Sequence, residues 1–242
     1  MPRFFIDFEP NAETFLDGEN GVHIVRSLRM RPGESLTLCA GTGKDFFCTV
    51  TDCRPDGALV RVDEVRDTVS EPKTKITVCP GWPKGDKLET VVQKSVELGA
   101  FEIWPVLSAR CVAKPEKSAL EKKTVRLQKI AREAAQQSGR GIIPRVLPAE
   151  KLSDALRTAA ENGDVLFFYE NGTAGLRQAL QRAGERLYIF IGPEGGFAPE
   201  EAKLAEELGA GILTLGPRIL RAETAPLAAL SAILYERGDF ER

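Results

Sequence analysis

Two short loops near the C-terminal end of the chain carry the residues best suited to chemistry. Each loop opens with Gly-Pro directly after an apolar run: residues 192–196 follow the run 187–191, and residues 216–218 follow the run 211–215. Ligands of open α/β sheets bind beyond the carboxyl ends of the strands, so we expect both loops to border one ligand site. Glycine permits close approach to a ligand and proline fixes the backbone, which predicts a rigid pocket.

The second loop continues into three polar side chains, Arg221, Glu223 and Thr224. An arginine could stabilise a developing anion, and a glutamate could accept a proton. Two simpler interpretations stay open: Glu223 could only favour the dipole of a following helix, and the Gly-Pro pairs could be ordinary tight turns. Neither loop matches GxGxxG or GxxxxGK[ST], and the first encloses Glu194, so the pattern favours a neutral or cationic ligand.

The composition is that of a soluble globular protein. The 242 residues are 43% hydrophobic and 28% charged, which suits one large domain or two smaller ones. No apolar run is long enough to span a bilayer, and the N-terminus lacks the features of a signal peptide, so we expect a cytoplasmic protein. Five cysteines without a CxxC pair, and a single histidine, His23, predict neither a disulfide framework nor a metal site.

Charge is distributed unevenly along the chain. The net charge of −2 argues weakly against a nucleic-acid partner, but residues 110–145 contain ten Lys or Arg against three Glu. Such a segment could form a local phosphate-binding face. The alternative is a basic helix surface that is simply solvated.

Residues 1–70 read as a small antiparallel sheet or barrel. Strand-like segments at 35–39, 46–51 and 59–65 are separated by Gly and Asp-Gly turns. Between turns, residues 23–29 show helical spacing, with Arg26 and Arg29 facing outward. We expect His23 to cap or pack rather than to catalyse.

A polar, Pro-containing break at residues 68–75 marks the expected domain boundary. Beyond it, strands alternate with helices, which predicts an α/β fold with a mostly parallel sheet. Asp86 and Glu89 resemble a capping box at the start of one helix, and Gly99 is typical of its C′ position. The expected strands are 75–79, 102–106, 142–146, 164–169, 187–191 and 211–215, and the other expected helices are 116–138, 150–161, 174–183 and 224–237.

The two loops together resemble a known signature. Residues 191–197 read IGPEGGF and residues 215–225 read LGPRILRAETA, which is similar to the SPOUT-class RNA methyltransferases and, more narrowly, to the RsmE family. Residues 93–99, Arg110 and residues 132–140 fit the same family, so the resemblance covers most of the chain. One departure is Ala222, where the family pattern has threonine, which puts a small polar contact in doubt.

The resemblance implies an activity and a set of site residues. RsmE proteins methylate N3 of a uridine in small-subunit (16S) ribosomal RNA with S-adenosylmethionine, and Arg221 and Glu223 suit the catalytic roles. The implied partner is that RNA or the assembled subunit, with phosphate contacts from Arg26, Arg29, Arg110, Arg132 and Arg140. The residues implied to hold the cofactor are Gly192, Pro193, Glu194, Gly195, Leu215, Gly216, Ile219, Leu220 and Ala225.

The resemblance also implies an architecture. Residues 1–70 would form a PUA-like RNA-binding β-barrel, and residues 71–242 a SPOUT methyltransferase domain with a trefoil knot, in a homodimer. The knot follows from the resemblance alone, since ordinary topology rules favour an unknotted sheet. Two alternatives stay open: a non-catalytic ribosome-assembly protein, and methylation of another RNA atom such as the ribose 2′-OH.

Overall fold

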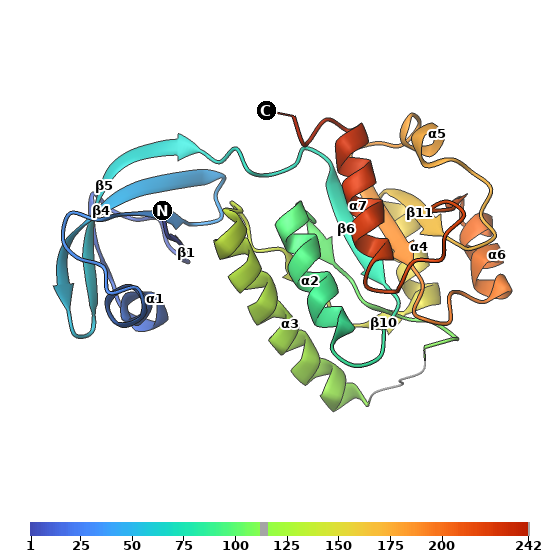
Figure 1. Cartoon of the computed structure of the whole chain (residues 1–242), viewed down its shortest axis with the longest axis horizontal. Helices are drawn as coiled ribbons and strands as arrows, with labels where there is room; N and C mark the ends of the chain where they lie inside the picture. Colours follow the sequence, from blue (N-terminus) through green and yellow to red (C-terminus); the bar gives the residue numbers. More distant parts are fainter. Residues whose placement is uncertain (112–115, 242) are drawn as a thin grey trace. The chain divides into compact units, whose positions relative to one another are not determined.

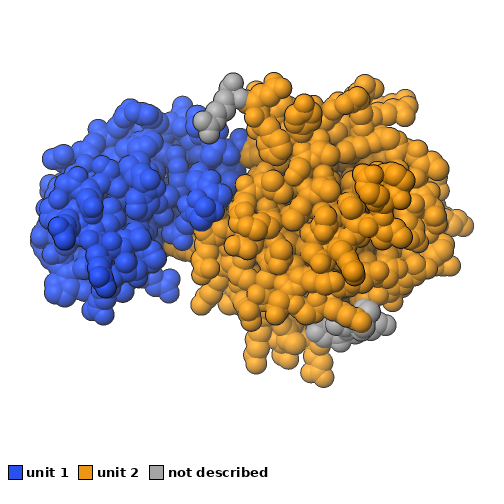
Figure 2. All heavy atoms as spheres, viewed as in Figure 1, with its two compact units in different colours: residues 1–71, 135–143 blue, residues 72–134, 144–242 orange. Residues whose placement is uncertain are grey.

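A computed structural model describes residues 1–111 and 116–241 (Figure 1). The chain divides into two compact units, coloured separately in Figure 2. The N-terminal unit contains residues 1–71 and 135–143, and the C-terminal unit contains residues 72–134 and 144–242. The first division lies inside the polar break at 68–75, whereas the return of residues 135–143 has no counterpart in the sequence pattern.

The N-terminal unit is built on a five-stranded sheet in the order β1-β3-β4-β5-β2. β1 pairs with β3 in parallel, and the other neighbours are antiparallel. Alternate residues of β4, Phe46, Cys48 and Val50, enter the core, as expected for a sheet with one covered face. The strands are β1 (Arg3–Phe5), β2 (Glu13–Leu16), β3 (Ser35–Cys39), β4 (Lys44–Arg54) and β5 (Gly57–Asp67).

One helical segment closes the core of this unit. It begins as α1 (Gly18–Val22) and continues as a π-helical turn, His23–Ser27, so the ordinary helical spacing predicted for 23–29 is wrong in its geometry. Ile24 is fully buried, while Arg26 and Arg29 are exposed. The ring of His23 packs edge-on against Phe4 at 5.9 Å between centroids, which confirms its packing role.

The C-terminal unit contains a six-stranded parallel sheet in the order β13-β11-β12-β6-β7-β9, which confirms the predicted α/β fold. The predicted strand 102–106 is split, because Pro105 offers no donor to a ladder. Its pieces, β7 (Glu102–Ile103) and β8 (Val106–Leu107), join different sheets, and β8 pairs with β10 (Glu150–Lys151). The other strands are β6 (Lys75–Pro80), β9 (Arg145–Val146), β11 (Asp164–Phe168), β12 (Arg186–Ile191) and β13 (Gly211–Leu213).

Helices cover both faces of this sheet. Tyr188 and Phe190 of β12 pack with α4 and α6, while the alternate residues Leu187 and Ile189 are buried toward the other face. That face carries α2 and α7, which lie side by side (Figure 1). No helix in the described part of the chain is long and apolar enough to cross a bilayer. The helices are α2 (Lys87–Leu98), α3 (Lys117–Ser138), α4 (Leu152–Asn162), α5 (Leu176–Leu180), α6 (Pro199–Glu207) and α7 (Ala225–Glu236).

Of the two ends predicted for α2, the C-terminal one is confirmed and the N-terminal capping box is not. Gly99 adopts φ 111° after the last helical residue, which confirms its C′ role. The predicted capping box is wrong, because Asp86 forms no side-chain cap hydrogen bond. Glu89 instead accepts hydrogen bonds from Lys123 Nζ at 2.6 Å and Arg126 Nη2 at 2.9 Å, both on α3.

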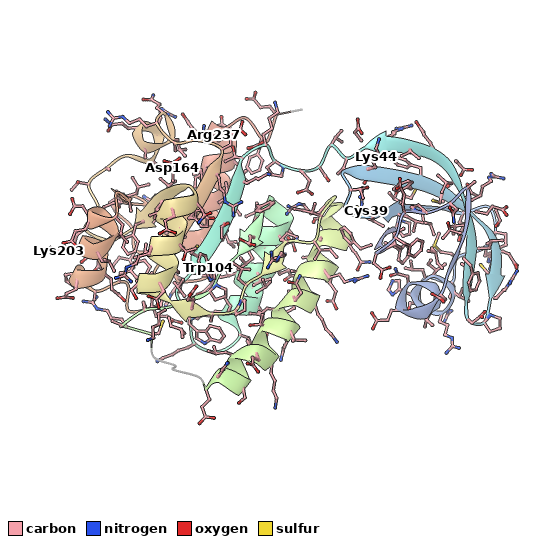
Figure 3. The ribbon with its side chains drawn as sticks, turned by 180° about the vertical axis from the view of Figure 1, so that it is seen from behind. Cys39, Lys44, Trp104, Asp164, Lys203 and Arg237 are labelled. Atoms are coloured by element: carbon pink, nitrogen blue, oxygen red, sulfur yellow. The ribbon has the colours of Figure 1, made fainter. Side chains whose placement is uncertain are left out.

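The entry into β12 is fixed from two neighbouring elements. Arg237, just after α7, donates to the carbonyls of Ala183 and Gly184 at 2.7 and 2.9 Å. Asp164, at the start of β11, accepts the N–H of Gly184 at 2.8 Å (Figure 3). This turn sets the register of the strand whose far end carries the first Gly-Pro loop. The knot predicted for this C-terminal segment stays a prediction.

Candidate active site at the carboxyl edge of the parallel sheet

Three strand exits, rather than two, meet at this edge. β6 and β12 are neighbours in the sheet, and the N–H of Gly81 after β6 donates to the Ile191 carbonyl at 2.7 Å. A Cβ on Gly81 would lie 2.5 Å from Cδ of Pro193, so only glycine lets the two exits touch. The exit after β6, residues 81–86, therefore packs directly against the first Gly-Pro loop.

The first Gly-Pro loop, residues 192–198, folds back on itself. A Cβ on Gly192 would lie 2.9 Å from the carbonyl carbon of Gly196, and Gly196 itself has φ 65°. The N–H of Gly196 closes the turn on the Pro193 carbonyl at 2.8 Å. Both glycines are thus required by the shape of the loop.

Residues 109 and 110 brace this loop from outside. The Glu201 carboxylate of α6 accepts the N–H of Ala198 at 2.8 Å and the N–H of Ala109 at 2.7 Å. Arg110 Nη1 donates to the Gly195 carbonyl at 3.0 Å. The loop is therefore held in one conformation by contacts from both α6 and the segment after β8.

The second Gly-Pro loop, residues 214–224, leads from β13 into α7. Its turn uses φ 91° at Gly216, and the Arg221 carbonyl accepts the N–H groups of Thr224 and Ala225 at 2.8 and 2.9 Å. The backbone of Arg221 thus starts α7, while its side chain is exposed. Ile219 is 94% exposed, so the loop presents both a cation and an apolar side chain to solvent.

Lys87, the first residue of α2, links the two loops. Its Nζ lies 2.9 Å from Oε1 of Glu194 in the first loop and 3.4 Å from Oε2 of Glu223 in the second. The shorter contact is a hydrogen bond; the longer one is an ion pair without good hydrogen-bond geometry. The side chains of Lys87, Glu194 and Glu223 are 32%, 26% and 32% exposed, so one partly buried cation serves two carboxylates.

The electrostatics of the Lys87–Glu194 contact favour both charged forms. The hydrogen bond to Glu194 raises the pKa of Lys87. Partial burial alone would raise the pKa of Glu194, but the hydrogen bonds from Lys87 and from backbone N–H groups, including that of Lys84 at 3.2 Å, lower it overall. The ammonium and the first carboxylate therefore both stay charged at neutral pH.

Comparison with known proteins identifies the family. Residues 70–234 match the RNA methyltransferase domain family, and residues 16–63 match the RNA methyltransferase PUA domain family. Ribosomal RNA small subunit methyltransferase E of Bacillus subtilis is 36% identical over 99% of this chain and 100% of the relative. The chain belongs to the RsmE family of RNA methyltransferases.

Two similar solved structures agree with this assignment. The ribosomal RNA small subunit methyltransferase E of Neisseria gonorrhoeae, bound to S-adenosylmethionine, is 33% identical, with a TM-score of 0.88 over 97% of both chains. A putative methyltransferase from Legionella pneumophila, in complex with the same cofactor, is also 33% identical, with a TM-score of 0.86 over 96% of both chains. The resemblance to the RsmE family inferred from the two loops is thereby confirmed.

The residues predicted from the RsmE resemblance to hold the cofactor all lie at this sheet edge. They occupy the two Gly-Pro loops and the first residue of α7: Gly192, Pro193, Glu194, Gly195, Leu215, Gly216, Ile219, Leu220 and Ala225. Positive φ falls at Gly196 and not at Gly195. Gly195 is instead constrained by Arg110, whose Cβ would lie 3.2 Å from an added Cβ.

The arginines predicted to contact RNA belong to both units. Arg26 and Arg29 are exposed in the N-terminal unit, and Arg132 is exposed on α3. Arg110 lies beside the first Gly-Pro loop.

Arg140 requires a correction. It is only 3% exposed, and its guanidinium donates to both oxygens of Glu71, at 2.9 and 2.6 Å. An internal ion pair with Glu71, in the same unit, replaces the surface phosphate contact predicted for it. The case for residues 110–145 as a phosphate-binding face is weakened further, because Lys123 and Arg126 pair with Glu89 and their charge is partly neutralised.

The exit after β6 and Lys87 were missed by sequence reasoning, although a signal existed. Strand 75–79 is followed by Pro80, Gly81 and Pro83, the same residue types that punctuate the other two exits. This exit contains no Gly-Pro pair, because its residues occur in the order Pro80-Gly81, so it does not match the pattern of the other two exits. Within residues 1–111 and 116–241, no group of three or more His, Cys, Asp or Glu side chains is placed to hold a metal ion.

Proposed function

We propose that this protein transfers the methyl group of S-adenosylmethionine to N3 of a uridine in small-subunit (16S) ribosomal RNA. The family membership and the cofactor bound in two relatives support this. The observation that carries it is the meeting of three glycine- and proline-shaped strand exits at one sheet edge, with Glu223 and Arg221 in one of them.

The residues at this edge fit the cofactor chemically. Apart from Gly216 itself and its two chain neighbours, no atom of the described residues lies within 4 Å of where a Cβ on Gly216 would stand. Half-buried Leu215 and Leu220 offer apolar surface for a nucleobase. Two carboxylates against one lysine leave an excess of negative charge, which suits a cationic ligand. Bound there, the cofactor would supply a methyl group already activated by its positive sulfur. The nine loop residues predicted from the resemblance would hold it, largely through backbone groups.

The remaining chemistry falls to two side chains of the second loop. The N3–H of uracil is weakly acidic, so its proton must be taken up as the reaction proceeds, and Glu223 is the proposed acceptor. Arg221, exposed in the same loop, would stabilise the negative charge that develops on the base. The rigid loops would align the reacting atoms.

RNA binding is assigned to exposed arginines of both units. Residues 1–70 are proposed to act as a PUA-like RNA-binding barrel with Arg26 and Arg29 on phosphates, and residues 71–242 as the methyltransferase domain with Arg110 and Arg132. The proposed partner is small-subunit RNA or the assembled subunit, which supports a cytoplasmic location.

We also propose a homodimer. Large apolar side chains are exposed near the C-terminal end, including Tyr235 of α7 at 68% and Phe240 at 51%. Burial of such side chains against a second copy would remove apolar surface from water. Light scattering should give twice the chain mass, and a monomer at micromolar concentration would contradict this.

A methyl-transfer assay tests the proposed reaction. Unmodified small-subunit RNA and assembled subunits are each incubated with the protein and tritiated S-adenosylmethionine, followed by nucleoside analysis. We expect label in 3-methyluridine. Label on a ribose 2′-oxygen would instead assign methylation of another atom, and RNA binding without any label would identify a non-catalytic assembly protein.

A further inference from the structure

We infer that Lys87 is a positioning residue for the proposed methyl transfer, acting by holding the Glu223 carboxylate, charged, against the first Gly-Pro loop. This inference rests on the proposed function, in which Glu223 accepts the uracil proton. Lys87 itself would touch neither substrate nor cofactor. Its contribution would pass entirely through the two carboxylates that it pairs with.

The position of Lys87 is fixed by the fold. It is the first residue of α2, and the next turn buries Leu88, Val91 and Val92 in the core. On its N-terminal side, the close approach of Gly81 to Pro193 ties the exit after β6 to the first loop. The ammonium is therefore held between the two Gly-Pro loops by a helix whose opposite face is anchored in the core.

The charges between the two loops are unbalanced, which makes Lys87 important for Glu223. Two charged groups are linked to Glu223: Lys87 of α2 directly, and Glu194 through the shared ammonium, while the Arg221 side chain on the same loop is exposed. Glu194 already takes the shorter contact, 2.9 Å against 3.4 Å. Without the ammonium, two carboxylates would face each other, and like charges favour protonation of one of them.

Protonation of Glu223 would block its proposed role. In the proposed reaction, the N3–H bond would break and its proton would pass to the Glu223 carboxylate, while the N3 electron pair would bond to the methyl carbon. The bond between that carbon and the sulfur of the donor would break, with its electron pair remaining on the sulfur, which would leave as a neutral thioether. A carboxyl group that already carries a proton cannot accept another. Lys87 keeps its own proton throughout, so it acts by position and charge alone.

The test compares Lys87→Met with Lys84→Met, a matched loss of charge three residues earlier. Lys84 is exposed and contacts Glu194 through its backbone N–H, which the substitution retains. Single-turnover methylation is measured at saturating cofactor and RNA, from mildly acidic to alkaline pH. We expect Lys87→Met to be roughly ten- to a hundred-fold slower at neutral pH, less than the roughly 10²- to 10⁴-fold that a general base contributes, because Glu223 itself is retained.

The pH profile separates positioning from a merely structural effect. A nearby cation favours the ionised carboxylate, so its removal should move the acidic limb of the profile to higher pH, with the rate recovering as pH rises. Glu194→Gln should move that limb the opposite way, because Lys87 then serves Glu223 alone. Lys87→Arg should recover much of the rate, and Lys84→Met should keep the wild-type profile.

A double variant tests the route of the effect. If Lys87 acts through Glu223, then Lys87→Met combined with Glu223→Gln should be about as slow as Glu223→Gln alone. Additive losses would overturn the inference, as would a wild-type profile in Lys87→Met or an equal loss in Lys84→Met. If circular dichroism shows that Lys87→Met does not fold, the pH profile of Glu194→Gln becomes the test. An acidic limb that does not move in Glu194→Gln would then overturn the inference. A wild-type protein that methylates no RNA would contradict the proposed function itself, before any variant is compared.

Discussion

Two clusters of charged side chains, one in each unit, use similar residue types but differ in how completely their charges are matched. In the N-terminal unit, one guanidinium meets one carboxylate: Arg140 donates twice to Glu71, and the N–H of Gly141 adds a third bond at 2.7 Å. In the C-terminal unit, the single ammonium of Lys87 is shared by Glu194 and Glu223. The first cluster is closed and balanced, whereas the second is open and carries excess negative charge.

The difference follows from the chemistry of the two cations. The planar fork of arginine matches a carboxylate in two parallel bonds and leaves little capacity for another ligand. A lysine ammonium is a compact point charge that can lie between two acceptors without satisfying either completely. The Arg140–Glu71 pair is therefore expected to stabilise the fold, whereas the shared ammonium of Lys87 lies where chemistry is proposed.

The largest expected effect concerns the arginine next to the open cluster. Arg221→Ala should lower kcat roughly a hundred- to a thousand-fold with little change in KM for the cofactor, because the lost interaction strengthens in the transition state. Arg221→Lys should recover part of the rate, since the charge remains without the planar fork. Arg218→Ala, at another exposed arginine of the loop, is the control for methylation kinetics. Full activity of Arg221→Ala would place the anion-stabilising group elsewhere.

Breaking the closed cluster should affect stability and not chemistry. Arg140→Met leaves Glu71 without its partner and should cost about 3 kcal/mol of unfolding free energy, at the low end for a buried pair because Glu71 is partly exposed. Lys129→Met, exposed on α3, should be nearly neutral. Urea denaturation measures both. A stable Arg140→Met that loses only RNA affinity would restore the surface role first predicted for Arg140.

Arg29 is exposed and its backbone is strained. Variants at this position test whether RNA binding explains why a non-glycine residue is kept in an unfavourable conformation. Its φ of 53° makes it the one non-glycine residue with positive φ in the described part of the chain. Arg29→Gly should be more stable than Arg29→Ala by about 1 kcal/mol, because glycine tolerates the left-handed region. Both variants should reduce the log–log salt dependence of RNA binding by roughly 0.7–0.9 for one lost phosphate contact. Equal stabilities, or an unchanged salt slope in both, would contradict these expectations.

The smallest expected effect is a loss of folding stability in acid, and it concerns a second ion pair, Arg3–Asp45. Burial raises the pKa of Asp45, but hydrogen bonds from Arg3 at 2.7 and 2.6 Å and from Thr68 at 2.8 Å lower it overall. A carboxylate with a depressed folded pKa contributes stability above its unfolded pKa, about 3.9, and loses it as pH falls through the folded value. Denaturation below about pH 4 should show this loss. Asp45→Asn should flatten it, and an unchanged slope would assign the acid sensitivity to other carboxylates.

Local sequence patterns predicted the features that depend on neighbouring residues. Strand β3 coincides with the predicted 35–39, α3 ends at Ser138 as predicted, and Gly99 terminates α2. The two Gly-Pro loops lie at strand ends for the same reason, because periodicity and glycine placement are short-range signals.

What escaped prediction depends on partners that are distant in sequence. Glu71 lies 69 residues from Arg140, and Lys87 lies 107 residues from Glu194. A charged residue has the same appearance in the sequence whether it meets solvent, a phosphate or a buried carboxylate. The π-helical turn after α1 escaped as well, because hydrophobic spacing indicates a helical segment without fixing its hydrogen-bond pattern.

The return of residues 135–143 to the N-terminal unit has a consequence for how such a protein can evolve. The chain crosses between units at 71/72, 134/135 and 143/144, so the N-terminal unit is not encoded by one contiguous stretch of gene. A fragment ending at residue 71 would encode Glu71 without Arg140 and Gly141, which bind it. Recombination at a single breakpoint would therefore separate a buried ion pair. Exchange of this N-terminal unit for another would need coordinated replacement of two gene segments, which favours inheritance of both units as one piece.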